Sequence, residues 1–239
     1  MDFAKGYIDI HTHILPGVDD GALSTAEALA MVKMAYETGT RGLVLTPHDG
    51  GRFKQNDLER SFRAFCREVE REVPGMKLFL GRELFLETEV PAALAERQEW
   101  TINRSRYCLV EFYPSAPRSW IVTGVWEMVR SGYIPIIAHP ERYGAFRRDK
   151  ALIDEVLQMG ALIQLNAGSI MGRGGYRTTL FCNRLLKARK VHFVASDAHN
   201  LTNRSPRLEE CWKKVSKRWG KEYARQLFYE NARQVLAGE

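Results

Sequence analysis

The chain has 239 residues, of which 45% are apolar and 27% are charged. This composition excludes disordered, collagen-like and fibrous proteins, and the chain is long enough to bury a full core. No apolar run approaches the roughly 20 residues that cross a bilayer. The segment before His11 is too short for the apolar region of a signal peptide. We therefore expect one cytoplasmic domain over residues 1–239, without insertion into a membrane.

Lysine and arginine exceed aspartate and glutamate by 35 to 29, which gives a net charge of +6. Such an excess suits an anionic substrate or partner, but it also suits solubility alone. Part of it lies in one cluster at residues 147–150 and another at residues 213–221. The second cluster has helical spacing with acids nearby, which is typical of a solvated helix face. No nucleic-acid-binding motif accompanies it.

Short apolar runs alternate with longer amphipathic segments along the chain. The runs mostly lack the polar–apolar alternation of half-exposed strands, which indicates strands buried on both faces of a parallel sheet. Ser24 and Glu27 form a capping box at the start of the first amphipathic segment. In chain order, we predict strand 6–10, helix 24–39, strand 42–45, helix 57–73, strand 77–80, helix 91–99, strand 107–110, helix 120–131, strand 134–138, helix 150–159, strand 161–165, helix 178–188, strand 191–195 and helices 207–219 and 222–236.

Strand–helix alternation of this kind predicts an α/β fold with one parallel sheet. A regular TIM barrel needs one strand more than the seven predicted here. We therefore favour a distorted seven-stranded TIM-like barrel. An open doubly wound sheet is the alternative, but the glycine-rich phosphate turn typical of it does not occur.

Five of the six histidines fall at or just after the carboxyl end of a predicted strand, where α/β proteins place their active sites. His192 lies early in its strand, and we expect it to be structural. Carboxylates share the same strand ends. His11 and His13 are two residues apart in a strand, so both imidazoles point to the same face. The candidate metal ligands are His11, His13, Asp20, His48, Glu83, Glu111, His139, Asp197 and His199.

Nine protein ligands exceed the needs of one ion and suffice for two or three. Imidazole and carboxylate without thiolate suit Mn, Fe or Zn. Adjacent cations generate a nucleophile from water and neutralise the anionic oxygens of phosphate esters, so a phosphoester hydrolase is favoured. Arg142 and Arg204 follow two of the histidine motifs and are candidates to hold phosphate oxygens.

A cysteine-dependent phosphatase mechanism is excluded, because it needs an arginine six residues after the cysteine. The residues at those positions are glutamate, proline, alanine and lysine. The cysteines also form no C-x-x-C motif, and we expect small buried thiols in a reducing compartment. They are Cys66, Cys108, Cys182 and Cys211.

Together, the motifs D-I-H-T-H…D-D-G, T-P-H, G-R-E, E-F, A-H-P-E-R-Y, N-A-G-S and S-D-A-H-N resemble the polymerase-and-histidinol-phosphatase (PHP) superfamily. They are most similar to its bacterial protein-tyrosine phosphatases of capsule and exopolysaccharide clusters. The resemblance runs from residue 9 to about residue 204. It implies a distorted barrel with three metal ions, often manganese, and a metal-bridging hydroxide that attacks phosphorus without a phosphoenzyme. The implied partner is a tyrosine autokinase with a phosphorylated tail.

The resemblance also implies roles for individual residues. One metal would bind His11, His13, Glu83 and Asp197; Glu83 would bridge to a second, held with Glu111 and His139; a third would bind Asp20, His48 and His199. Asp197 would also contact the nucleophile, and Arg142 and Arg204 match the phosphate-contacting arginines. Asp49 departs from the pattern, because a second histidine often follows the T-P-H histidine in these phosphatases.

Alternatives stay open at this point. A PHP-type phosphatase acting on a small metabolite such as histidinol phosphate keeps the metals and changes the substrate. A metal-dependent amidohydrolase would often use a lysine at a strand end, and no predicted strand ends in lysine. A non-catalytic module would lack ligands, whereas all nine are present. The sequence leaves the native metal and a homo-oligomeric state undecided.

Overall fold

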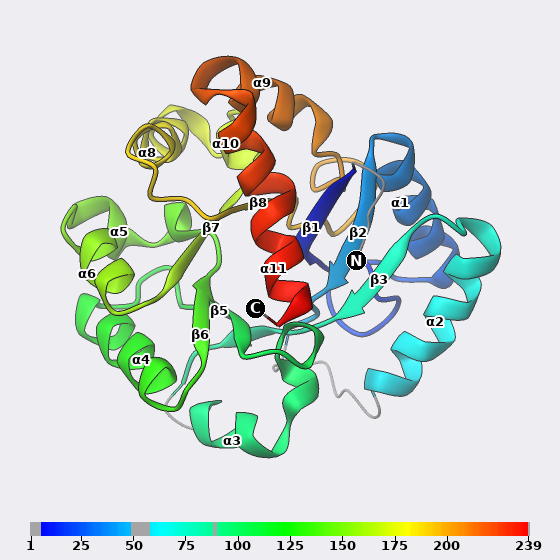
Figure 1. The fold of residues 1–239 in the computed structure, drawn as a ribbon, viewed down its shortest axis with the longest axis horizontal. Coiled ribbons are helices and arrows are strands. Elements are labelled where there is room, and N and C mark those ends of the chain that lie inside the picture. Colours follow the sequence, from blue (N-terminus) through cyan, green and yellow to red (C-terminus); the bar gives the residue numbers. More distant parts are fainter. Residues whose placement is uncertain (1–5, 49–57, 88–89, 239) are drawn as a thin grey trace.

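Parallel strands form the centre of the molecule, and helices surround them (Figure 1). The computed structural model describes residues 6–48, 58–87 and 90–238. Every strand pairing recorded within these residues is parallel. The strands are β1 (Tyr7–Thr12), β2 (Thr40–Leu45), β3 (Lys77–Leu80), β4 (Glu83–Phe85), β5 (Tyr107–Glu111), β6 (Ile134–Ile137), β7 (Leu162–Asn166) and β8 (Phe193–Ala195). All seven predicted strands are therefore present, and β4 is additional.

The additional strand arises because the chain breaks its extended course at Gly81 and Arg82. Before this break β3 pairs with β2, and after it β4 pairs with β5. The strands consequently form a three-stranded sheet in the order β1-β2-β3 and a five-stranded sheet in the order β4-β5-β6-β7-β8. The predicted third strand is thus β3 alone, and the unpredicted β4 begins the second sheet.

Isolated bonds join these two sheets in two places, which we call the seams. At one seam His48 forms a bridge with Glu83, and the Glu83 amide donates to the Pro47 carbonyl at 3.2 Å. At the other, the Asp197 amide donates to the His11 carbonyl at 3.0 Å, and the His13 amide donates to the Ala198 carbonyl at 2.8 Å. The result is a distorted TIM-like arrangement as expected, but with eight strands rather than the seven predicted, and with irregular seams in place of continuous ladders.

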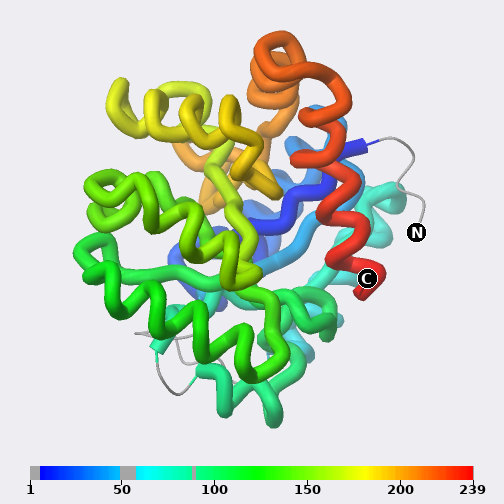
Figure 2. Tube along the Cα trace, turned by 60° about the vertical axis from the view of Figure 1, so that its left-hand side comes forward, coloured from blue at the N-terminus to red at the C-terminus, as the bar shows by residue number. Residues whose placement is uncertain are grey.

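The long helices follow the predicted order and pack around the outside, as the green to yellow helices show in Figure 2. Ser24 accepts a hydrogen bond from the Glu27 amide at 3.2 Å, so the predicted capping box opens the first helix. The short helices α5 and α7 were not predicted. The helices are α1 (Thr25–Glu37), α2 (Leu58–Glu72), α3 (Val90–Glu96), α4 (Arg118–Arg130), α5 (Gly144–Arg148), α6 (Leu152–Gln158), α7 (Ala167–Ile170), α8 (Gly175–Lys187), α9 (Glu209–Trp219), α10 (Lys221–Arg225) and α11 (Asn231–Ala237).

The C-terminal segment packs against the barrel rather than against the outer helices alone. Helices α10 and α11, joined by a π-helical turn at Gln226–Glu230, cross the front of the barrel in Figure 1. Val235 and Leu236 of α11 belong to the same buried cluster as Ile8 and Ile10 of β1. This packing leaves the carboxyl ends of the strands available for a site. Within the described part of the chain, no helix is long and apolar enough to cross a membrane.

Candidate metal centre

All nine predicted ligand side chains meet at the carboxyl ends of the strands. Their nitrogen and oxygen atoms form four overlapping groups, each with its members within 4.8 Å of one another. The groups are His13, Asp20, His48 and His199; His11, Glu83 and His139; His11, His13 and Asp197; and His48, Glu83 and Glu111. His11, His13, His48 and Glu83 each belong to two groups. This sharing is the arrangement expected where neighbouring ions have common ligands.

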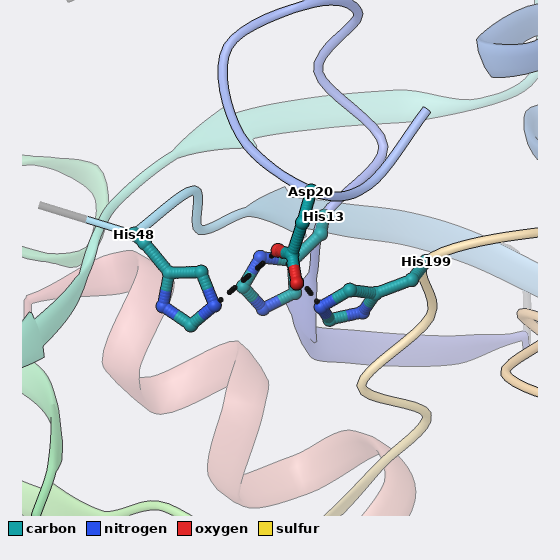
Figure 3. Close-up of side chains that lie close together, drawn as sticks. All are labelled: His13, Asp20, His48 and His199. Carbon is teal, nitrogen blue, oxygen red and sulfur yellow. Dashed lines mark ion pairs between the residues drawn. The ribbon is translucent and has the colours of Figure 1, made fainter. Parts of the chain in front are cut away.

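The first group surrounds the Asp20 carboxylate (Figure 3). Asp20 Oδ1 lies 3.5 Å from His48 Nε2 and 3.4 Å from His199 Nε2. His199 Nε2 is buried and has no hydrogen-bond partner among the described residues. Burial, followed by the neighbouring His13, lowers the pKa of His199 to about 2. A neutral imidazole with an unused, inward-facing lone pair is the form that binds a metal ion.

A chain of hydrogen bonds fixes which nitrogen of His11 carries its proton. The Asp197 carboxylate only accepts, so the side-chain amide of Asn166 donates to it at 2.7 Å. The Asn166 carbonyl oxygen then accepts from Gln164 Nε2 at 2.8 Å, and Gln164 Oε1 faces His11 Nδ1 at 3.0 Å. His11 Nδ1 is therefore the donor, which leaves the lone pair on Nε2.

His13 is held in the same tautomer by Asp19, whose Oδ2 accepts from His13 Nδ1 at 2.7 Å. The Nε2 atoms of His11 and His13 then face each other at 3.1 Å. Two lone pairs at this distance repel unless a proton or a cation lies against them. Oxygen acceptors behind both imidazoles are the usual support of metal-binding histidines. The geometry therefore fits a cation bound by both Nε2 atoms.

Glu83 is the carboxylate at the centre of the cluster. Its Oε1 lies 2.8 Å from His139 Nε2, and its Oε2 lies 3.2 Å from both His13 Nε2 and His48 Nδ1. Burial alone would raise the pKa of Glu83, but the imidazoles, His11 first, hold it well below its ordinary value. The two oxygens thus face different members of the cluster, as a bridging carboxylate must.

Without bound cations, protonated imidazoles balance the buried carboxylates. Burial lowers the pKa of His13, but Asp19 and Glu83 outweigh it and raise the value to about 9. His48 reaches about 9 in the same way, because Glu111 and Glu83 outweigh its burial. Divalent cations compete with these protons for the same lone pairs. The excess of carboxylate charge is thus suited to more than one such cation.

A tight loop after β1 positions Asp19 and Asp20. The Ala22 amide donates to the His13 carbonyl at 3.0 Å, and the Gly21 amide donates to Asp19 Oδ1 at 2.9 Å. A Cβ atom at Gly21 would lie 1.8 Å from the His13 carbonyl oxygen. Only glycine permits this approach, which explains the D-D-G motif physically.

Two of the ligand candidates have left-handed backbone conformations. His139 has φ 35° and Asp197 has φ 54°, and each is the second residue after the end of a buried strand. Such conformations cost about 1–3 kcal/mol for a non-glycine residue and concentrate at functional sites. Here they turn the chain at the strand end so that both side chains face the cluster.

Two arginines contact the Asp197 carboxylate from the solvent side. Arg204 Nη2 donates to Oδ1 at 2.6 Å, and Arg142 Nη2 donates to Oδ2 at 2.7 Å. Burial raises the pKa of Asp197, but His11, Arg142 and other cationic neighbours outweigh it and hold the value below its ordinary range. The arginines, Asn166 and Asp197 line a cleft of about 480 Å³. The predicted catalytic residues are therefore together, at the opening of the cluster.

Four residues of the site were not predicted from the sequence, namely Asp19, Tyr143, Gln164 and Asn166. Tyr143 accepts a hydrogen bond from the Phe112 amide, and its hydroxyl lies 3.1 Å from His139 Nδ1. The available signal for Gln164 was a polar residue within an apolar run. His192 lies outside the cluster, where its Nδ1 accepts from the Ile163 amide, as expected of a structural histidine. Asp49 lies outside the described residues.

Comparison with known proteins places the chain in a family. Residues 7–237 match the family described as Capsular polysaccharide synthesis, CpsB/CapC. The chain belongs to the CpsB/CapC family. The resemblance to the phosphatases of capsule clusters is thereby confirmed, because the family is described by capsular polysaccharide synthesis and its members similar to this chain are named tyrosine-protein phosphatases.

The CpsB/CapC relatives match over nearly their whole length. Tyrosine-protein phosphatase YwqE of Bacillus subtilis is 34% identical over 237 residues, which cover 97% of this chain and 92% of YwqE. Tyrosine-protein phosphatase CpsB of Streptococcus agalactiae is 34% identical over 239 residues, or 96% of this chain and 98% of CpsB. A solved structure described as YwqE from Bacillus subtilis and CpsB from Streptococcus pneumoniae, unique metal-dependent tyrosine phosphatases, matches with a TM-score of 0.91 at 33% identity, covering 97% of this chain and 95% of that one.

Proposed function

We propose that this CpsB/CapC protein is a metal-dependent protein-tyrosine phosphatase. The observation that carries the proposal is the convergence of nine imidazole and carboxylate ligands beside two arginines. Its relatives of matching length are named tyrosine-protein phosphatases, and the similar solved structure is described as metal-dependent. The donor set contains no thiolate, and oxygen and nitrogen ligands suit Mn²⁺.

We infer that the cluster holds three divalent ions and that these are Mn²⁺, because every donor is an imidazole nitrogen or a carboxylate oxygen. His11, His13, Glu83 and Asp197 would hold one ion, Glu83 with Glu111 and His139 a second, and Asp20, His48 and His199 a third. When bound, such ions lower the pKa of coordinated water and neutralise charge on phosphoryl oxygens. The position of Glu83 between two groups supports its bridging role.

The residues of the chain itself supply the remaining requirements of phosphoester hydrolysis. Arg142 and Arg204 each present a guanidinium at the opening of the site. There each can give up its hydrogen bond to Asp197 and donate instead to two oxygens of a phosphoryl group. Asn166 keeps its hydrogen bond to Asp197 and so holds that carboxylate in place. The arginines thereby orient the phosphorus toward the buried cluster.

The cysteines are not candidates for a nucleophile. Cys108, Cys182 and Cys211 are buried, and burial raises the pKa of Cys211 to about 12. A thiol in this state is protonated and unreactive at neutral pH. The partner we propose is a tyrosine-phosphorylated protein, specifically a tyrosine autokinase, as the resemblance implies.

The test compares substrates and metals on protein purified without chelator. We expect at least about two ions per chain, hydrolysis of a phosphotyrosyl peptide, loss of activity with chelator and recovery with Mn²⁺. Phosphoseryl peptide and histidinol phosphate serve as comparison substrates. Faster turnover of histidinol phosphate than of the phosphotyrosyl peptide would show that the substrate is a small metabolite rather than a protein. Fewer than about two ions per chain, or full activity in chelator, would contradict the metal assignment.

A further inference from the structure

A second, larger groove lies next to the cleft of the metal centre. It has a volume of about 1200 Å³ and is formed by α5, the residues after it, α8 and the end of α9. Helices α5 and α8 lie on the same side of the molecule in Figure 1. The groove includes the cluster at residues 147–150, which the proposed function does not use. We call it the basic groove.

The basic groove is lined by seven cationic side chains. They are Arg147, Arg148 and Lys150 from α5 and the residues after it, Arg177, Arg184 and Lys187 from α8, and Arg218 from α9. Among the described residues that line the groove, none is acidic. In the part of the chain that the structure describes, none of the seven forms an ion pair, whereas exposed cations such as Lys33, Arg63 and Arg118 do.

These seven residues account for the net charge of the protein. Without them, 28 of the 35 lysine and arginine residues remain, against 29 aspartate and glutamate residues. The rest of the chain is therefore nearly neutral in total, whereas the described lining of the groove carries seven positive charges and no negative charge. A concave surface of one sign attracts ligands of the opposite sign more strongly than scattered charges do.

The basic groove adjoins the active-site cleft, because Arg147 lines both. The cleft also contains Arg142, Arg204 and Asp197 of the metal centre. A polypeptide whose phosphotyrosine occupies the cleft would thus pass Arg147 on its way into the groove. The groove also contains the exposed Leu180, which can contact apolar side chains of a peptide.

We propose that the basic groove binds an acidic stretch of the substrate polypeptide beside its phosphotyrosine. The proposal rests on the proposed phosphatase activity and adds a substrate class to it, namely phosphotyrosyl segments flanked by carboxylates or further phosphates. The position of the groove next to the cleft favours a polypeptide over a nucleic acid, because one phosphotyrosyl chain can then occupy both. Arg177 and Lys187 are specificity-determining residues that touch neither the phosphoryl group nor the metal ligands.

The test uses the double variant Arg177→Glu/Lys187→Glu. The control is Arg67→Glu/Lys77→Glu, which makes the same charge change at two exposed residues of α2 and β3, on the opposite side of the molecule in Figure 1. The substrates are p-nitrophenyl phosphate and two phosphotyrosyl peptides of equal length, one flanked by glutamates and one by glutamines. All are compared with the wild type at low and moderate salt.

We expect the groove variant to lose about tenfold or more in kcat/KM on the acidic peptide, because two attractions become repulsions. Its kcat/KM on p-nitrophenyl phosphate and on the neutral peptide should stay within about twofold of wild type. The control variant should resemble wild type on all three substrates. Equal rates of the wild type on the acidic and neutral peptides, or equal losses in the groove and control variants, would overturn the proposal.

A binding measurement separates the groove from the catalytic activity. A fluorescent glutamate-rich peptide without phosphotyrosine should bind the wild type and the control variant, and bind the groove variant at least about tenfold more weakly. This result with no hydrolysis of any phosphopeptide would contradict the phosphatase while leaving the groove intact. A single-stranded oligonucleotide of equal charge that binds more tightly and displaces the peptide would overturn the choice of a polypeptide.

Discussion

Gln164 shows how a residue without any chemistry of its own can determine that of its neighbour. It lies inside β7, where its amide nitrogen donates to Asn166 and its amide oxygen faces His11 Nδ1. The orientation of the Gln164 amide therefore determines which nitrogen of His11 carries the proton. This orientation follows from Asp197, because its carboxylate can only accept and so requires the amide nitrogen of Asn166 to face it. A change at Gln164 should therefore affect metal binding before it affects the fold.

Replacing Gln164 by methionine should weaken Mn²⁺ binding by about 10- to 100-fold, the usual effect of losing the oxygen behind a metal-binding histidine. Methionine has nearly the same length and packs in the same space. Gln164→Glu keeps an oxygen next to His11 Nδ1 and should bind Mn²⁺ more tightly than the methionine variant. Calorimetric titration of the chelator-treated proteins measures this difference, and equal affinities of all three would contradict the role of Gln164.

A second prediction for a single residue concerns the binding of phosphate by Arg204. Arg204→Ala should lower kcat/KM by about 10- to 150-fold with metal content unchanged, since a charge-assisted hydrogen bond contributes about 1.5–3 kcal/mol. Arg204→Lys should recover part of the loss, because lysine keeps the charge without the planar fork. Arg207→Ala is the matched control, as Arg207 is exposed and has no ion pair with any described residue. Unchanged kinetics in both Arg204 variants would remove this residue from the active site.

At the level of elements, the strands and long helices were predictable because their apolar patterns are local. The additional strand β4 was not, because its three residues form a strand only by pairing with β5, which follows it in the chain. The convergence of the nine candidate ligands could be predicted because strand ends meet at one edge of a parallel sheet. Asp19, Gln164 and Asn166 could not, because their partners are defined by side-chain hydrogen bonds rather than by position along a strand.

The loop after β1 provides a prediction for an element. Gly21→Ala should destabilise the protein by about 1–3 kcal/mol, because the new methyl group collides with the His13 carbonyl. The same shift should move Asp20 and weaken Mn²⁺ binding. Gly81→Ala is the control, since a Cβ there meets its nearest neighbours at 3.4 Å, an ordinary contact. Urea unfolding measures the stability, and equal losses in the two variants would contradict the close approach at Gly21.

On the scale of the whole molecule, the candidate metal centre lies where the two sheets meet. His11, His13 and His48 come from the three-stranded sheet and the loops that follow it, whereas Glu83, Glu111 and His139 belong to the five-stranded sheet or its strand ends. Bound ions would therefore connect two sheets that few backbone hydrogen bonds join. Metal binding and the stability of the seams should be coupled.

Removal of metal should accordingly speed hydrogen exchange at the seams more than within the sheets. The amides of His13, Glu83 and Asp197 donate across the seams, and we expect their exchange to accelerate by about tenfold or more after chelation. Amides between β5 and β6 should change less, because a regular ladder protects them. Adding Mn²⁺ at about 100 times its Kd should restore about 2.7 kcal/mol of stability. Uniform acceleration over all strands would contradict a specific opening at the seams.

The division of the barrel into two sheets has a consequence for the lifetime of the protein. If the ions fasten the sheets together, a shortage of divalent metal would do more than stop turnover. The loosened chain would expose its seams to proteases, and opened molecules are degraded in proportion to their population. A cell short of metal would then lose the protein itself rather than store an inactive form, and restored activity would have to wait for new synthesis.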